Sequence, residues 1–111
     1  MRLRKHDVKC LQDARELIDK NYSRSLFIPD IAYEIGMSST KLKDSFRELF
    51  GISLHAYIVK VRMGHARRQL EETDKPLQAI AIETGYKSSS SFIVAFRGHF
   101  GLTPGQFRRS M

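Results

Sequence analysis

The sequence has a single cysteine, Cys10, which rules out an internal disulfide and suits a reducing compartment. No apolar run approaches the ~20 residues that span a bilayer. The first ten residues, MRLRKHDVKC, are charged and lead into no apolar stretch of the kind that marks a secretion signal. We therefore expect a cytoplasmic protein with no membrane partner.

Patterns that carry catalytic or metal chemistry are also missing. The four histidines lack metal-ligand spacing, and Cys10 has no discernible histidine or acidic partner. A glycine-rich phosphate loop is absent too. We expect no catalytic residues, no metal site and no cofactor, and we do not expect an enzyme.

Acidic residues are a minority, with 12 Asp and Glu against 19 Lys and Arg, which gives a net charge of +7 over 111 residues. Such an excess favours a polyanionic partner, most often a nucleic acid. On charge alone, a merely basic surface is an equal alternative. Hydrophobic residues make up 41% of the chain, which is enough for the core of one small domain.

Strand signals are weak, whereas glycine and proline separate segments with helical periodicity. The pattern predicts an all-α fold of about seven helices. The first follows Asp7 as its N-cap, and the others are expected at 29–35, 39–50, 54–73, 77–84, 89–100 and after Thr103-Pro104. The chain then divides into a first helix-turn-helix subdomain at 1–53, a linker helix at 54–73 and a second helix-turn-helix subdomain at 74–111.

The expected long helix carries two apolar stripes about 150° apart, at 3.6 residues per turn. One stripe contains Leu54 and Ile58, and the other contains Met63, Ala66 and Leu70. A helix with two such stripes packs against different neighbours on its two sides, as a connecting helix does.

The two halves of the chain repeat one another. Ile31-Ala32 and Gly36 match Ile80-Ala81 and Gly85 at a separation of 49. From the next helix onward the separation is 50, and the matched pairs are Leu42 with Phe92, Phe46 with Phe96, Arg47 with Arg97, Phe50 with Phe100, Gly51 with Gly101 and Tyr57 with Phe107. The second copy therefore has one extra residue in its turn, and each copy reads as a helix-turn-helix.

Three segments carry a family resemblance: IAYEIGMSSTKLKDSFRELFGISLHAYI, VRMGHARRQLEET and IAIETGYKSSSSFIVAFRGHFGLTPGQFR. Through them the chain resembles the DNA-binding domain of the AraC/XylS family of bacterial transcription regulators, over nearly its whole length. The resemblance implies seven helices, two helix-turn-helix units joined by a long helix, and binding to two successive major grooves. It also implies transcription activation and contact with RNA polymerase.

The longer helix of each unit is expected to enter the major groove and to present the residues opposite its core stripe. On the helix at 39–50 these lie about 100° to 200° from Leu42. The first-unit contact candidates are Thr40, Lys43, Asp44 and Arg47, with Ser39 near the helix start. The alternative is an ordinary solvated helix face, and Arg47 could contact phosphate or base.

The equivalent candidates of the second unit are Ser89, Ser90, Ile93, Val94 and Arg97. Ile93 and Val94 depart from the polar residues that are more usual in the family. As exposed β-branched side chains they could contact thymine methyl groups. The other readings are that this unit reads few bases, that the pair forms a protein-contact patch, or that it is more buried than the helical wheel indicates.

The leading hypothesis is sequence-specific binding of double-stranded DNA at an asymmetric site in two adjacent major grooves, to regulate transcription. A linker helix of about twenty residues would span roughly 30 Å, close to the ~34 Å turn of B-DNA. The alternatives are a helical protein-interaction module and a non-specific architectural DNA binder. Most members of the family are longer, so we expect a C-terminal part of a larger regulator, whose missing N-terminal domain would bind any effector ligand. A stand-alone short regulator is the alternative.

Overall fold

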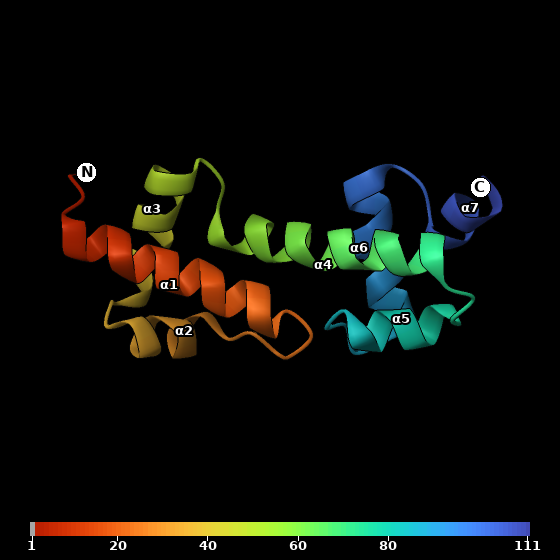
Figure 1. Ribbon diagram of the computed structural model, residues 1–111, viewed down its shortest axis with the longest axis horizontal. Coiled ribbons are helices and arrows are strands. Elements are labelled where there is room, and N and C mark those ends of the chain that lie inside the picture. Colours follow the sequence, from red (N-terminus) through yellow and green to blue (C-terminus); the bar gives the residue numbers. More distant parts are fainter. Residues whose placement is uncertain (1) are drawn as a thin grey trace. The chain divides into compact units, whose positions relative to one another are not determined.

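The computed structural model describes residues 2–111, which form seven α-helices and no strand (Figure 1). The helices are α1 Lys5–Asn21, α2 Ile28–Ile35, α3 Ser39–Phe50, α4 Leu54–Glu72, α5 Leu77–Glu83, α6 Ser89–Phe100 and α7 Pro104–Arg109. The predicted all-α fold is thereby confirmed. The chain divides into two compact units, the first ending at Ile58 and the second running from Val59 to Met111, so the boundary falls inside α4.

In the first unit, α1, α2 and α3 pack against one another (Figure 1). The apolar stripe of α1 supplies Leu11, Ala14 and Ile18, all fully buried. From α3, Leu42 and Phe46 are also fully buried. These side chains form the centre of the core of the first unit.

The start of α1 differs from the prediction. The helix begins at Lys5 with Arg4 as its N-cap, so the assignment of Asp7 as N-cap is wrong. Asp7 lies inside the first turn, where its Oδ2 accepts a hydrogen bond of 3.1 Å from the backbone N–H of Arg4. An acidic side chain at the third helical position can accept a hydrogen bond from a free N–H at the helix start, as a capping residue does. An aspartate near the start of a helix therefore gives a similar sequence signal at the N-cap and at the third position.

In the second unit, the second stripe of α4 packs with α5 and α6. Its core cluster consists of Met63, Ala66, Leu70, Ile80, Ala81, Phe92 and Phe96. Leu54 and Ile58 of the other stripe belong to the first unit and are buried as well. The two-stripe prediction for α4 is thus confirmed, and it explains why one continuous helix serves both units.

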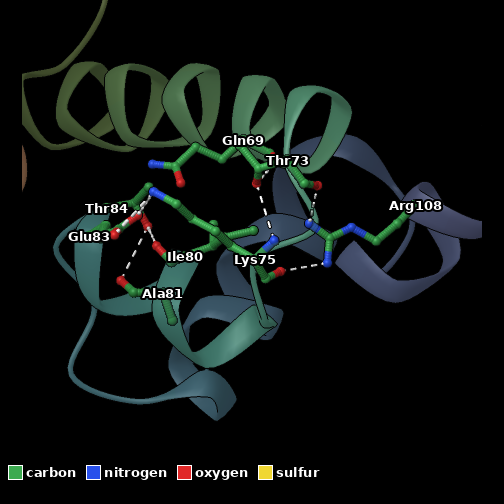
Figure 2. Close-up of polar contacts among 8 residues, drawn as sticks. All are labelled: Gln69, Thr73, Lys75, Ile80, Ala81, Glu83, Thr84 and Arg108. Carbon is green, nitrogen blue, oxygen red and sulfur yellow. Dashed lines mark hydrogen bonds and ion pairs between the residues drawn. The ribbon is translucent and has the colours of Figure 1, made fainter.

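Arg108 ties α7 to the segment that follows α4 (Figure 2). Its guanidinium donates hydrogen bonds to the carbonyl oxygens of Lys75 at 2.7 Å and Thr73 at 3.1 Å. Nearby, the ammonium of Lys75 pairs with Glu83 of α5 at 3.1 Å. These contacts hold the segment after α4, the end of α5 and α7 together within the second unit.

The turn of each helix-turn-helix contains a glycine with positive φ, 78° at Gly36 and 98° at Gly85. In both units the residue after this glycine donates its N–H to a carbonyl of the preceding helix at 2.9 Å, Met37 to Ala32 and Tyr86 to Ala81. Because the left-handed conformation strains any residue with a Cβ, glycine is required there. The N-cap of the next helix is Ser38 in the first unit and Ser88 in the second, which confirms the extra residue in the second turn.

Candidate DNA-binding surface

Helix α3 is fixed at both ends and along one side. The hydroxyl of Ser38 accepts a hydrogen bond of 3.1 Å from the N–H of Lys41, and the helix ends at Gly51. Behind the helix, the ring of Phe46 lies 4.6 Å from that of Phe50 and 5.6 Å from that of Tyr57. This aromatic packing leaves the opposite side of α3 facing outward.

The outward side of α3 carries four of the five predicted contact residues. Thr40, Lys43, Asp44 and Arg47 are exposed, and Ser39 at the helix start is half-buried. Within residues 2–111, none of the charged groups of Lys43, Asp44 and Arg47 is held in an ion pair. Two donors and one acceptor therefore face outward without an intramolecular partner.

These side chains also border a groove that the sequence reasoning missed. It has a volume of about 350 Å³ and is lined by Ile28, Lys43, Asp44, Arg47, Ser53, Leu54 and His55. The hydroxyl of Ser53 accepts a hydrogen bond of 3.1 Å from the N–H of Ala56 at the start of α4. Gly51 ends α3 and so marks a short turn before Ser53. That turn is the sequence signal from which the position of Ser53 and His55 near the contact residues could have been predicted.

Lys41 is the basic residue of α3 that is engaged inside the first unit. Its ammonium lies 3.0 Å from the carboxylate of Asp7, whose side chain is only 9% exposed. The backbone N–H of Arg4 and the ammonium of Lys41 both hold the pKa of the Asp7 carboxyl below its ordinary value. Lys41 therefore links α3 to α1, whereas Lys43, two residues later, has no ion pair with any residue from 2 to 111.

Helix α6 repeats the construction of α3. The hydroxyl of Ser88 accepts a hydrogen bond of 3.2 Å from the N–H of Ser91, and the helix ends at Gly101. The ring of Phe96 lies 4.6 Å from that of Phe100 and 5.7 Å from that of Phe107. These distances reproduce those around Phe46 to within 0.1 Å, as the predicted pairing of the two copies requires.

The outward side of α6 carries Ser90, Val94 and Arg97, which are exposed, whereas Ser89 and Ile93 are half-buried. The expectation that Ile93 and Val94 would both be exposed is therefore wrong for Ile93. Ile93 lies about 100° from Phe92 on the helix, at the edge of the core stripe. Lys43 holds the same position on α3 and is exposed, because its long stem carries the ammonium out to solvent.

One further expectation is corrected by the geometry. Cys10 does have a histidine neighbour, since its Sγ lies 3.5 Å from Nε2 of His6, one helical turn earlier. Cys10 is buried. Across residues 2–111, no group of three or more His, Cys, Asp or Glu side chains is placed to hold a metal ion. Over the same residues, no helix is both long and apolar enough to cross a membrane.

Comparison with known proteins places this arrangement in a family. A family model described as a helix-turn-helix domain matches residues 31–110. The chain is 32% identical over 92 residues to the melibiose operon regulatory protein of Escherichia coli K12, a match that covers 83% of this chain and 30% of that protein. It is 33% identical over 94 residues to the virulence regulon transcriptional activator VirF of Yersinia enterocolitica, with 85% and 35% covered. The chain thus spans about a third of the length of these curated relatives.

Solved structures agree with the sequence relatives. The C-terminal domain of AraT, a response regulator from Geobacillus stearothermophilus, matches with a TM-score of 0.90 and 29% identity, covering 100% of this chain and 89% of that one. An AraC-type transcriptional regulator from Chromobacterium violaceum matches with a TM-score of 0.81 and 30% identity, covering 92% and 91%. With its paired helix-turn-helix units and their outward-facing helices, the chain belongs to the AraC/XylS family of DNA-binding transcription regulators.

Proposed function

We propose that the chain activates transcription by binding a specific, asymmetric DNA sequence, with α3 in one major groove and α6 in the adjacent one. The observation that carries the proposal is a contrast between the two units. Their helices are anchored by matching aromatic contacts, yet they present different side chains outward, Lys43 and Asp44 in one and Ile93 and Val94 in the other. Two unlike reading faces require two unlike half-sites.

The face of α3 has the chemistry for reading bases through hydrogen bonds. The ammonium of Lys43 can donate to O6 and N7 of guanine, and the carboxylate of Asp44 can accept from N4 of cytosine. Thr40 and Ser39 can serve several bases or a phosphate through their hydroxyls. Arg47 lies a turn further along the helix, and we assign it to the DNA backbone, where a guanidinium fixes position rather than sequence.

The face of α6 offers fewer polar groups. The hydroxyls of Ser89 and Ser90 lie in the first turn of the helix, and Arg97 is the basic residue of its exposed side. We assign Arg97 to a phosphate, by the same reasoning as Arg47, and the two serines to phosphate or base contacts. Ile93 and Val94 complete this second set of contact residues.

The use of adjacent grooves is supported by the length of α4. Its 19 residues correspond to about 28 Å at 1.5 Å per residue, close to the ~34 Å turn of B-DNA. In this proposal residues 1–53 and 74–111 act as the two reading subdomains and residues 54–73 link them. The net charge of +7 supplies the general attraction to phosphates.

The relatives support a proposal about the wider function. The relative VirF is named a transcriptional activator, which supports activation here. We extend the proposal to contact with RNA polymerase and to a cytoplasmic, nucleoid-associated regulator. Binding of an effector ligand is assigned to a sensor domain outside these residues, because the relatives are about three times as long as the match.

The proposal is tested by selecting bound sequences from a random duplex library and titrating the selected site against a scrambled duplex at several salt concentrations. We expect a non-palindromic consensus and affinity at least about 10³-fold tighter than for the scrambled duplex. Binding without sequence preference would identify an architectural protein instead. Failure to bind any duplex would favour a protein-interaction module.

A further inference from the structure

Val94 is the most exposed apolar residue of the proposed reading faces, with 73% of its surface accessible. It lies on the outward side of α6, with Ser90 one turn before it and Arg97 one turn after it. We propose that Val94 reads the C5-methyl group of a thymine in the major groove and so sets the base preference of the second unit. This inference rests on the proposed function.

The side chain of Val94 limits what it can recognise on a base. In the repeat, Val94 stands where the first unit has Asp44. A carboxylate can accept a hydrogen bond from N4 of cytosine, whereas an isopropyl group can neither donate nor accept. The thymine methyl is the one apolar feature that the bases present in the major groove. A valine in this position therefore favours thymine.

The fold itself gives no reason for a valine at this exposed position. Valine is a weaker helix former than alanine, leucine or lysine, because its branched side chain loses rotamer freedom in a helix. Its side chain is also largely outside the core, so burial does not account for it. Neither helix formation nor packing explains Val94, and a contact outside the chain does.

The side chain of Val94 is held in place by the helix that carries it. Phe92 and Phe96 on the opposite side of α6 are fully buried, and Ser88 caps the helix start. The β-branched side chain of Val94 strongly prefers one χ1 rotamer in a helix. Its methyl groups therefore occupy a defined position relative to the helix. Ile93 is half-buried beside them, which leaves Val94 as the principal contact.

The experiment replaces each thymine of the selected site in turn with deoxyuridine, which lacks only the C5-methyl group. For the parent protein we expect the affinity to fall about fourfold at the thymine that meets Val94, the value of one buried methyl group. Val94→Ala should bind the thymine and deoxyuridine forms of that site equally well. Its affinity should be close to that of the parent for the deoxyuridine form.

Two control variants test whether the thymine preference is specific to Val94. Ile82→Ala removes another exposed branched residue, 55% accessible and on α5 of the same unit, and should keep the parent's thymine preference. Arg97→Ala should weaken binding to both forms by the same factor. Equal affinity of the parent for both forms at every thymine would overturn the inference, as would a Val94→Ala variant that keeps the fourfold preference. Failure to select any site would instead overturn the proposed function itself.

Discussion

The carboxylate of Asp7 lies 3.0 Å from the ammonium of Lys41 and joins the first turn of α1 to the first turn of α3. The pKa of Asp7 is lowered from its ordinary value of 3.8, first by the N–H of Arg4 and then by Lys41. A carboxyl whose pKa is lower in the folded state stabilises the fold above its unfolded pKa. That contribution is lost as the pH falls through the folded value.

We therefore predict that the melting temperature of the chain falls as the pH is lowered below about 4, and that Asp7→Asn removes part of this dependence. Lys41→Gln should remove a smaller part, because the hydrogen bond from Arg4 remains. Thermal unfolding followed by circular dichroism between pH 2 and pH 7 checks both variants. An Asp7→Asn curve parallel to that of the parent throughout would contradict the assignment.

At alkaline pH, the phenol of Tyr57 makes the stability of the fold depend on pH. Burial of the phenol, together with the hydrogen bond of 2.5 Å that its hydroxyl donates to Asp19, raises the pKa of Tyr57 to about 12. A raised pKa means that the neutral phenol stabilises the fold below the unfolded pKa of 10 and that this contribution is lost between pH 10 and pH 12. We predict that Tyr57→Phe shows a shallower alkaline loss of stability than the parent, measured as melting temperature against pH. If the melting temperature fell equally steeply with pH in both proteins, Tyr57 would not be the group responsible.

On the proposed DNA face, Lys43→Ala and Arg47→Ala should weaken binding to the selected site while changing the free energy of unfolding by no more than about 0.5 kcal/mol, since both residues are exposed. If Arg47 contacts a phosphate, its loss should also reduce the salt slope of log Kd by about one. Lys9→Ala removes the same charge from the exposed side of α1 and serves as the control. Binding titrations at several salt concentrations distinguish the variants, and two variants that bind like Lys9→Ala would show that the face is misassigned.

The structural role of Arg108 gives a prediction about stability alone. Arg108→Ala removes two charged hydrogen bonds to the carbonyls of Thr73 and Lys75, and should lower the free energy of unfolding by about 1.5–3 kcal/mol. Arg109→Ala, at the exposed neighbouring position, should change it by less than about 0.5 kcal/mol. Urea unfolding of the two variants checks the difference, and equal midpoints would show that the contacts in Figure 2 contribute little.

Most helix bounds could be predicted because their signals are local. Ser38 and Ser88 cap the helices that follow them, and Gly51 and Gly101 end those helices in the left-handed conformation. Such signals depend on a few adjacent residues, so the sequence displays them directly. The start of α1 was missed because the capping bond uses a carboxylate from inside the helix rather than a residue before it.

The outward faces of α3 and α6 could be predicted from the sequence, but the contacts of individual side chains on them could not. Helical periodicity alone identifies which residues of α3 and α6 point away from Phe46 and Phe96. The partial burial of Ile93 depends on the elements packed beside α6, and the pairing of Lys41 with Asp7 joins residues 34 positions apart. Tertiary contacts of this kind leave no periodic signal in the chain. The difference in exposure between Ile93 and Val94 and the groove beside Ser53 are consequently visible only in the structure.

The matching ring distances of 4.6 Å between Phe46 and Phe50 and between Phe96 and Phe100 bear on how such a chain can be re-engineered. The aromatic packing behind α3 matches that behind α6, although positions 43 and 44 differ from positions 93 and 94. The residues at the exposed positions 44 and 94 can therefore be exchanged between units without disturbing the aromatic layer beneath them. A chain with valine at position 44 would carry two more similar faces and, under the proposed function, would prefer two more similar half-sites.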